Sequence, residues 1–196
     1  MGHRTGLFMS KRYQYCITPG VFSPEEILRI ERQITDLEPG NTDYTGVLRT
    51  SQISLLSADD PANLWIFDRL NTVLQQHNLE FYGYDIEYIQ PLQYSVYRAD
   101  HGGVYEWHQD WGSAVYNGRP EFARKLSFTL QLSDPLDYSG GRLEINYGQD
   151  YAKESEEYLE QGTLISFPSF MLHRISPLLA GERRSLVGWC MGPDYK

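Results

Sequence analysis

The hydrophobic positions of the chain follow a helical period up to about residue 85 and alternate with polar positions after it. The run Ser23-Pro24-Glu25-Glu26 is typical of a helix start: it combines a serine cap, a proline at the first helical position and a glutamate that closes a capping box. Apolar residues then recur at helical spacing at Ile27, Ile30, Ile34 and Leu37. We expect this helix to end at Pro39-Gly40, a second helix to run from Asp60-Pro61 to about His77, and a strand over residues 47–56 between them.

From residue 86 onward the alternation predicts short strands separated by turn residues. These strands are expected at residues 86–97, 104–111, 125–133, 142–147, 163–167, 170–176 and 183–191. Helices followed by strands indicate an α+β, mainly β fold. We expect a double-stranded β-helix (jelly roll) buttressed by the N-terminal helices, because this architecture protects the edges of the sheets. We expect a single domain over residues 1–196, with 1–85 as helical support and 86–191 as the jelly-roll core.

The predicted strand from Lys125 to Ser133 has an apolar and a polar face. The apolar face carries Leu126, Phe128, Leu130 and Leu132, and the polar face carries Ser127, Thr129 and Gln131. An ordinary antiparallel strand would turn the polar face to solvent. Alternatively, the apolar face lies under the helices and the polar face points into the barrel, where a polar ligand would bind. The pattern alone is compatible with both.

Composition and charge narrow the classes of protein that fit. The net charge of −9 argues against a broad nucleic-acid surface, which needs clustered lysine and arginine. No apolar run approaches the ~20 residues that span a bilayer, and no secretory signal is visible. The two cysteines, Cys16 and Cys190, form no disulfide or metal-binding pattern. We therefore expect a cytoplasmic protein that binds neither membranes nor nucleic acid, and we expect residues 149–161 to form an acidic loop or short helix.

A candidate metal site lies in the alternating run from Val104 to Trp111. Side chains two residues apart in a strand share a face, so His108 and Asp110 are expected side by side. A bare His-x-Asp pair is weak evidence, and His3, His77 and His101 are treated as ordinary structural histidines. The best third ligand is His173, because two histidines and one carboxylate form the facial triad of non-haem Fe(II) sites.

Arg183 and Ser185 share one face of the last predicted strand. A guanidinium beside a hydroxyl suits the binding of a carboxylate, and the alternative is an ordinary surface arginine in an ion pair. The order of the motifs favours the first interpretation. That order is His108-x-Asp110, then Asp137-Tyr138-Ser139-Gly140-Gly141-x-Leu143, then Gly162-Thr163-Leu164-Ile165-x-Phe167-Pro168, then His173, then Arg183-x-Ser185.

In this layout, over about residues 90–189, the chain resembles the Fe(II)/2-oxoglutarate-dependent dioxygenase superfamily, and within it the prolyl-4-hydroxylase-like branch. The resemblance implies Fe(II), 2-oxoglutarate and O2 as cofactor and co-substrates, with ascorbate as a further candidate. It implies iron ligation by His108, Asp110 and His173 and binding of the 2-oxoglutarate C5 carboxylate by Arg183, where collagen-type relatives keep lysine. It also implies contacts to 2-oxoglutarate from Ser185, Gln131 and Tyr97, with Tyr94 as an alternative to Tyr97. Tyr105 and Trp189 are expected to line the substrate side of the iron.

The activity that the resemblance implies is hydroxylation of a prolyl residue in a peptide or protein, with release of succinate and CO2. The presence of Asp110 favours hydroxylation over halogenation, since related halogenases lack this carboxylate. Hydroxylation of a free amino acid or small metabolite is an alternative, and a non-catalytic metal-binding jelly roll is an alternative of another class. The negative charge disfavours a nucleic-acid demethylase. Residues 112–124 are either a lid over the site or an ordinary connection.

Overall fold

The computed structural model describes residues 15–40, 47–110, 122–146 and 159–194. Its helical elements are α1 (Pro24–Glu31), η1 (Pro61–Asn63), α2 (Leu64–His77), η2 (Asn78–Tyr82) and η3 (Ala99–His101). Its strands are β1 (Cys16–Thr18), β2 (Glu38–Gly40), β3 (Arg49–Leu56), β4 (Tyr88–Ile89), β5 (Leu92–Arg98), β6 (Val104–His108), β7 (Phe122–Gln131), β8 (Tyr138–Gly140), β9 (Leu143–Ile145), β10 (Leu164–Pro168), β11 (His173–Ile175) and β12 (Leu178–Pro193). Within the described residues, no helix is long and apolar enough to cross a membrane.

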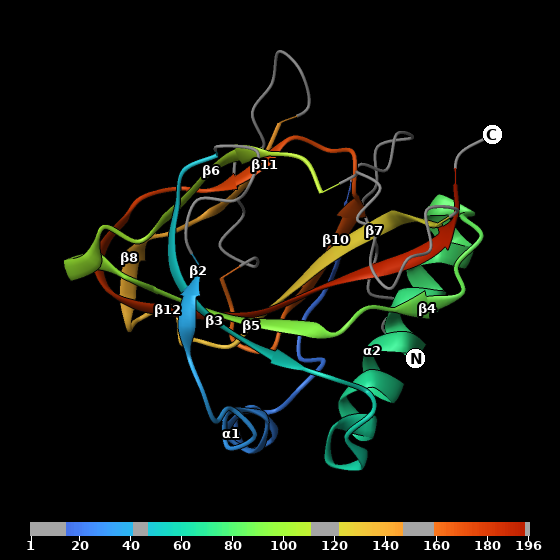
Figure 1. Ribbon diagram of the computed structural model, residues 1–196, viewed down its shortest axis with the longest axis horizontal. Coiled ribbons are helices and arrows are strands. Elements are labelled where there is room, and N and C mark those ends of the chain that lie inside the picture. The colour runs from blue at the N-terminus through green and yellow to red at the C-terminus, as the bar shows by residue number, and fades with distance from the viewer. Residues whose placement is uncertain (1–14, 41–46, 111–121, 147–158, 195–196) are drawn as a thin grey trace, which may run out of the picture.

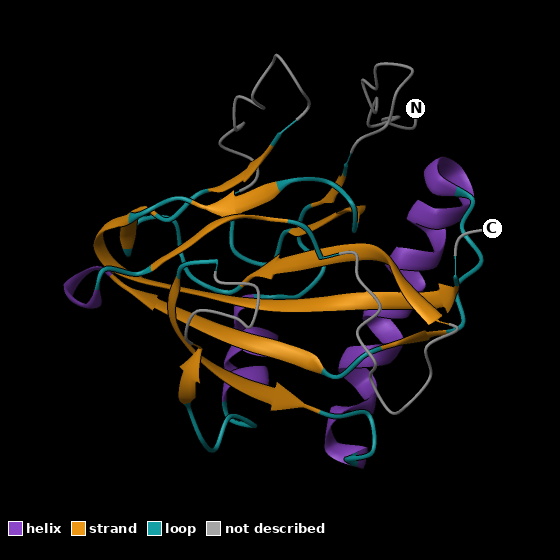
Figure 2. Ribbon diagram, turned by 45° about the horizontal axis from the view of Figure 1, so that its top comes forward, coloured by secondary structure: helices purple, strands orange, loops and turns teal. Residues whose placement is uncertain are grey.

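The strands form one antiparallel sheet that curls over on itself (Figure 1). Its order is β1-β10-β7-β12-β5-β3-β6-β11-β9, with β2 on β3 and with β4 and β8 on β12. The long strand β12 pairs with β7 on one side and with β5 on the other. Figures 1 and 2 show β6 and β11 above the layer that contains β7, β12 and β5, with α1 and α2 on the outer side of that layer. This arrangement confirms the predicted mainly β fold with N-terminal helices as support.

Two apolar clusters hold these layers together. The larger one joins the helices to the outer face of the sheet. It includes Ile27 and Ile30 of α1, Leu70 and Leu74 of α2, Leu126, Phe128 and Leu130 of β7, and Leu132 just after β7. The smaller one fills the space between the two layers of the sheet and includes Phe167, Leu143 and Ile175. The hydroxyl- and amide-bearing face of β7 therefore points into the barrel, so the second interpretation of this strand is confirmed.

Several element boundaries differ from the prediction. The capping box of α1 is present, since the Ser23 side chain accepts from the backbone N–H of Glu26 and the Glu26 carboxylate accepts from that of Ser23, but the helix ends at Glu31. The segment after it, Ile34-Thr35-Asp36, has poor helix propensity, and Pro39 disfavours a helical residue before it, so β2 forms there instead. Strands β1 and β8 were not predicted. The expected strand at 86–97 is interrupted at Gln90-Pro91, because proline cannot donate to a sheet ladder.

The buried His77 supplies a test of stability against pH. Its Nε2 lies 2.8 Å from Thr18 Oγ1 and its Nδ1 lies 2.8 Å from Ser166 Oγ, and burial lowers its pKa. The His77 ring therefore takes up a proton more readily in the unfolded chain than in the folded protein. The contribution of neutral His77 to the free energy of unfolding is present above its ordinary pKa of ~6.5 and is lost as the pH falls below that value. We expect urea unfolding from pH 7 to pH 5 to show a smaller loss of unfolding free energy in His77→Gln than in the wild type. Equal losses in the two proteins would contradict this.

Candidate metal centre

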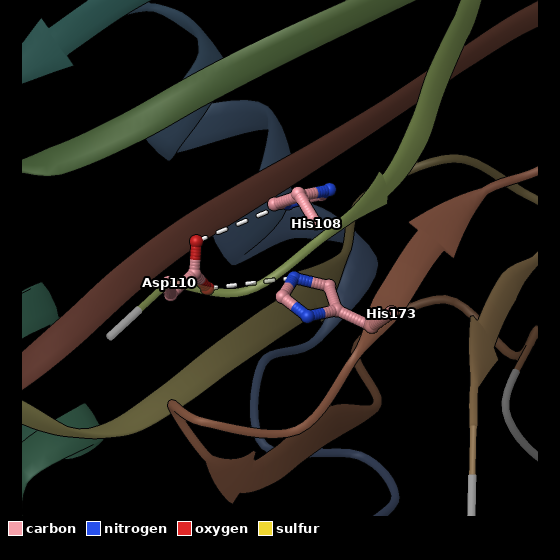
Figure 3. A group of neighbouring side chains, drawn as sticks. All are labelled: His108, Asp110 and His173. Atoms are coloured by element: carbon pink, nitrogen blue, oxygen red, sulfur yellow. Dashed lines mark ion pairs between the residues drawn. The ribbon is translucent and has the colours of Figure 1, made fainter. Parts of the chain in front are cut away.

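Two histidines and a carboxylate converge between the two layers of the sheet (Figure 3). His108 ends β6 and His173 begins β11, and these two residues face each other across the β6–β11 pair. The Nε2 atom of His108 lies 3.9 Å from Asp110 Oδ1, and that of His173 lies 3.4 Å from Asp110 Oδ2. One ligand atom from each of the three residues lies within 4.8 Å of the other two. The three predicted ligands are thus brought together.

The backbone places Asp110 and His108 in a way that simple strand alternation does not describe. Strand β6 ends at His108, so the expectation that the strand continues through Asp110 was wrong. The N–H of Asp110 donates instead to the carbonyl of Ser169 at 2.9 Å. The pairing also shifts within β6, because His173 faces His108 while Ile175 faces Tyr105, which leaves an extra residue on β6. Through this bulge Tyr105 stacks on the His108 ring, with 3.6 Å between ring centroids.

Both histidines present the same nitrogen to the space between them. His108 Nδ1 lies 2.7 Å from the carbonyl of Glu106, and His173 Nδ1 lies 2.9 Å from the carbonyl of Met171. A carbonyl only accepts, so each Nδ1 carries the proton and donates it, and each Nε2 keeps a lone pair facing the other ligands. This orientation is the one that a metal-binding histidine requires.

The charge states of these groups suit a divalent cation. Burial, together with the neighbouring His173, lowers the pKa of His108 to about 4, so its imidazole is neutral at physiological pH. Burial alone would raise the pKa of Asp110, but His173, His108, Arg124 and a hydrogen bond from Ser127 outweigh it and hold that pKa below its usual value. Two imidazole nitrogens and one ionised carboxylate are the donor set of a facial triad, and they fit a non-haem Fe(II) ion.

Two buried serines fix the orientation of the Asp110 carboxylate. Ser127 Oγ donates to Asp110 Oδ2 at 2.7 Å and lies 3.0 Å from Ser169 Oγ. Ser127 is 1% exposed and Ser169 is fully buried. Because Ser169 also holds the Asp110 backbone through its carbonyl, the carboxylate is positioned from two directions.

We expect Ser127→Ala to weaken metal binding ~10–100-fold, because loss of a partner that orients a ligand typically costs that much. Calorimetric titration with Zn(II) or Co(II) measures the change. Ser133→Ala is the matched control: this buried hydroxyl accepts from the N–H of Arg184 at 2.8 Å and plays no part in orienting Asp110. A Ser127→Ala protein that binds metal as tightly as Ser133→Ala would show that Asp110 is held without the serine.

A buried arginine lies beside this cluster. Arg183 is 1% exposed, its Nη2 donates to Gln131 Oε1 at 2.8 Å, and its Nη1 donates to Ser185 Oγ at 3.2 Å. Its Nε has no hydrogen-bond partner, and none of the carboxylates that the structure describes pairs with it. A buried guanidinium with only neutral partners is unfavourable, so the geometry provides for an anion.

A cavity joins the histidine cluster to the surroundings of Arg183. Besides the three candidate ligands, polar residues line its wall, namely Tyr97, Ser127, Thr129 and Ser185. The Thr129 hydroxyl is buried and has no hydrogen-bond partner among the described residues, which leaves it available to a ligand. Tyr97 lines this cavity, whereas Tyr94 points to the helical side, where its hydroxyl lies 3.5 Å from Glu31 Oε1.

The remaining predicted residues lie around the cavity rather than in its wall. Gln131 contacts Arg183, and Tyr105 covers His108. Trp189 lies under the guanidinium of Arg124, 3.8 Å from ring centroid to Cζ, and does not line the cavity. The suggested lid at 112–124 and the acidic segment at 149–161 fall mostly outside the described residues. Sequence reasoning missed Ser169, because an isolated serine carries no signal of its own.

Comparisons with known proteins agree with this geometry. A family model described as the 2OG-Fe(II) oxygenase superfamily matches residues 92–191. A PKHD-type hydroxylase of Teredinibacter turnerae is 31% identical over 186 residues, which cover 91% of this chain and 79% of the relative. The structure of a Pseudomonas putida prolyl-4-hydroxylase matches with a TM-score of 0.68 at 20% identity, over 93% of this chain and 94% of that chain.

A second solved structure is a prolyl hydroxylase from Trichoplax adhaerens in complex with a peptide fragment of the hypoxia inducible factor oxygen degradation domain. It matches with a TM-score of 0.68 at 16% identity, over 91% of this chain and 84% of that chain. At such identities these two structures establish a shared fold, which confirms the predicted jelly roll.

Proposed function

The chain belongs to the 2OG-Fe(II) oxygenase superfamily, and from this premise we propose that it hydroxylates prolyl residues of a peptide or protein, using 2-oxoglutarate and O2 and releasing succinate and CO2. It is a 2-oxoglutarate-dependent dioxygenase of the prolyl-hydroxylase-like type. We further propose that residues 1–196 act as one dioxygenase domain. The observation that carries the proposal is the buried cluster of His108, Asp110 and His173 in a cavity. Ser185 in the wall of this cavity accepts a hydrogen bond from the buried Arg183, which has no carboxylate partner among the described residues.

The polar residues in the cavity wall and directly behind it have roles in this proposal. His108, Asp110 and His173 would hold the iron through two Nε2 atoms and one carboxylate oxygen. Arg183 would bind the distal carboxylate of 2-oxoglutarate, with Ser185 and Gln131 fixing the plane of its guanidinium. Tyr97 and Thr129 would contact the body of the co-substrate, since both line the cavity. These assignments leave the buried arginine paired with a carboxylate, which removes the unfavourable charge.

When bound, the iron and 2-oxoglutarate supply the oxidising chemistry, in which decarboxylation is coupled to hydroxylation of a C–H bond. The protein contributes position and environment. The carbonyls of Glu106 and Met171 fix the tautomers of the two histidines, and Ser127 holds the Asp110 carboxylate. The apolar cluster around Phe167 and Ile175 excludes water from one side of the site, which limits unproductive turnover.

The prolyl substrate is proposed from the relatives, since one is named a PKHD-type hydroxylase and two matched structures are prolyl hydroxylases, one of them bound to a peptide. The test begins with anaerobic titration of the Fe(II) protein with 2-oxoglutarate, followed through the visible charge-transfer band of the chelate. Turnover is then measured as succinate release with proline-containing peptides, with and without ascorbate, and the products are analysed by mass spectrometry for hydroxyproline.

The possible outcomes separate the alternatives. Hydroxyproline in a peptide supports the proposal. Succinate release that is stimulated only by free amino acids would assign the enzyme to small metabolites instead. Absence of the band together with absence of 2-oxoglutarate binding would leave a jelly roll whose metal serves another purpose.

A further inference from the structure

A second arginine extends along the inner face of the sheet, and the proposed function gives it no role. Arg49 is the first residue of β3, where its Cα faces that of Tyr105 on β6. Its Nε donates to Ser51 Oγ at 2.9 Å, and its two terminal nitrogens lie 3.5 Å from Gln93 Oε1 and 3.4 Å from Ser95 Oγ. Gln93 is 9% exposed and Ser95 is fully buried, so the guanidinium reaches into the interior of the barrel.

The charge of Arg49 has no anionic partner among the described residues, where its hydrogen-bond acceptors are two hydroxyls and one amide. Other partly buried arginines do have one: Arg98 pairs with Glu182 at 2.7 Å, and Arg184 pairs with Glu31 at 2.6 Å. The contacts of the Arg49 terminal nitrogens are at the long limit of hydrogen bonding, whereas a charge-assisted bond to a carboxylate is shorter and stronger. The arrangement therefore favours a carboxylate brought by a ligand.

The position of Arg49 connects it to the metal centre. Its guanidinium lies 4.8 Å from the centroid of the Tyr105 ring, and that ring stacks on His108. Its acceptors Ser95 and Gln93 are the β-sheet partners of Ser185 and Val187, both of which line the cavity. Arg49 is thus next to the cavity, on the side formed by β3, β5 and β6, and one aromatic ring away from a candidate iron ligand.

We propose that Arg49 binds a carboxylate of the substrate, close to the C–H bond that is hydroxylated. This inference rests on the proposed function, in which the distal carboxylate of 2-oxoglutarate is taken by Arg183 and its other end by the metal. The carboxylate can come from an acidic side chain next to the target residue of a peptide, or from the main chain of a free amino acid. In both cases Arg49 selects a negatively charged substrate although the protein itself carries a net charge of −9.

The test compares probes that differ by one charge. Protein loaded with redox-silent Zn(II) and with 2-oxoglutarate is titrated calorimetrically with three pairs: blocked Gly-Glu-Pro-Gly against Gly-Gln-Pro-Gly, blocked Gly-Pro-Glu-Gly against Gly-Pro-Gln-Gly, and free proline against prolinamide. The acidic member of at least one pair is expected to bind on the order of tenfold more tightly, the effect of one charge-assisted hydrogen bond. Arg49→Gln abolishes the preference and Arg49→Lys retains part of it. The pair that shows the preference identifies the source of the carboxylate.

Arg98→Gln is the matched control, because it removes the same charge from an arginine that pairs with Glu182. It leaves the preference of the wild type unchanged, and thermal unfolding verifies that each variant is folded. Equal binding within all three pairs, absence of binding by every acidic probe, or an undiminished preference in Arg49→Gln would overturn the inference.

The Fe(II) enzyme separates the two proposals. Hydroxyproline formed equally from acidic and neutral peptides rejects only the role of Arg49. A charge preference in binding without hydroxyproline rejects only the prolyl activity.

Discussion

Replacement of His173 by alanine is expected to abolish iron-dependent turnover and to weaken metal binding by more than ~100-fold, beyond the loss typical of a residue that only orients a ligand. The reason is geometric. His173 Nε2 lies 3.4 Å from Asp110 Oδ2, and only His108 and Asp110 would remain to hold the ion. Metal affinity is measured by titration with Zn(II) or Co(II), and turnover by succinate release from 2-oxoglutarate.

The control for this variant is a second buried histidine. His77 is 5% exposed, lies in α2 on the outer side of the sheet and is bonded through both ring nitrogens to hydroxyls, so His77→Gln should keep both metal binding and turnover. Undiminished succinate release from His173→Ala would remove this residue from the metal site. Equal losses in the two variants would show that a damaged core, not a lost ligand, causes the effect.

Local chemistry was enough to predict most of the secondary structure. The Ser23 capping box and the helical spacing of α2 are local signals that can be recognised without knowing the rest of the fold. The elements that were not predicted are those that form only by pairing with another segment of the chain. Strand β1 exists because Cys16–Thr18 pairs with Leu164–Ser166, about 150 positions later, and β2 exists because Glu38–Gly40 pairs with β3. Three-residue strands of this kind carry no periodic signal.

In the candidate site, too, some residues could be predicted from local sequence and others could not. His108, Asp110, His173 and Arg183 were found because their spacing and order in the sequence carry the resemblance to the dioxygenases. The particular hydrogen bonds that orient these residues were not predicted, because they depend on which strands become neighbours. Ser127 meets Asp110 across 17 positions, and the Arg49 guanidinium approaches Ser95 across 46. In the sequence, Arg49 begins a polar run that looks like an ordinary sheet edge.

Replacement of Arg183 by alanine is expected to raise the KM for 2-oxoglutarate by ~100-fold while leaving metal affinity nearly unchanged. Removing one partner of a buried charge pair costs about 2–5 kcal/mol, and 3 kcal/mol corresponds to roughly that factor. Metal affinity is spared because Arg183 hydrogen-bonds to Gln131 and Ser185 and to none of the three candidate ligands. Succinate release at varied 2-oxoglutarate gives the KM, and Zn(II) titration gives the metal affinity.

Arg184, the residue after Arg183, supplies the control for this variant. Arg184 points to the helical side of the sheet and pairs with Glu31 at 2.6 Å, with 27% of its side chain exposed. Arg184→Ala therefore removes the same charge and a similar volume, at a cost in stability of about 0–1 kcal/mol and with no change in KM. Arg183→Lys keeps the charge but loses the planar fork, so its KM should lie between those of the wild type and Arg183→Ala. An unchanged KM in Arg183→Ala would mean that the co-substrate carboxylate is bound elsewhere. Arg49, whose guanidinium has no anionic partner among the described residues, would be the first residue to examine.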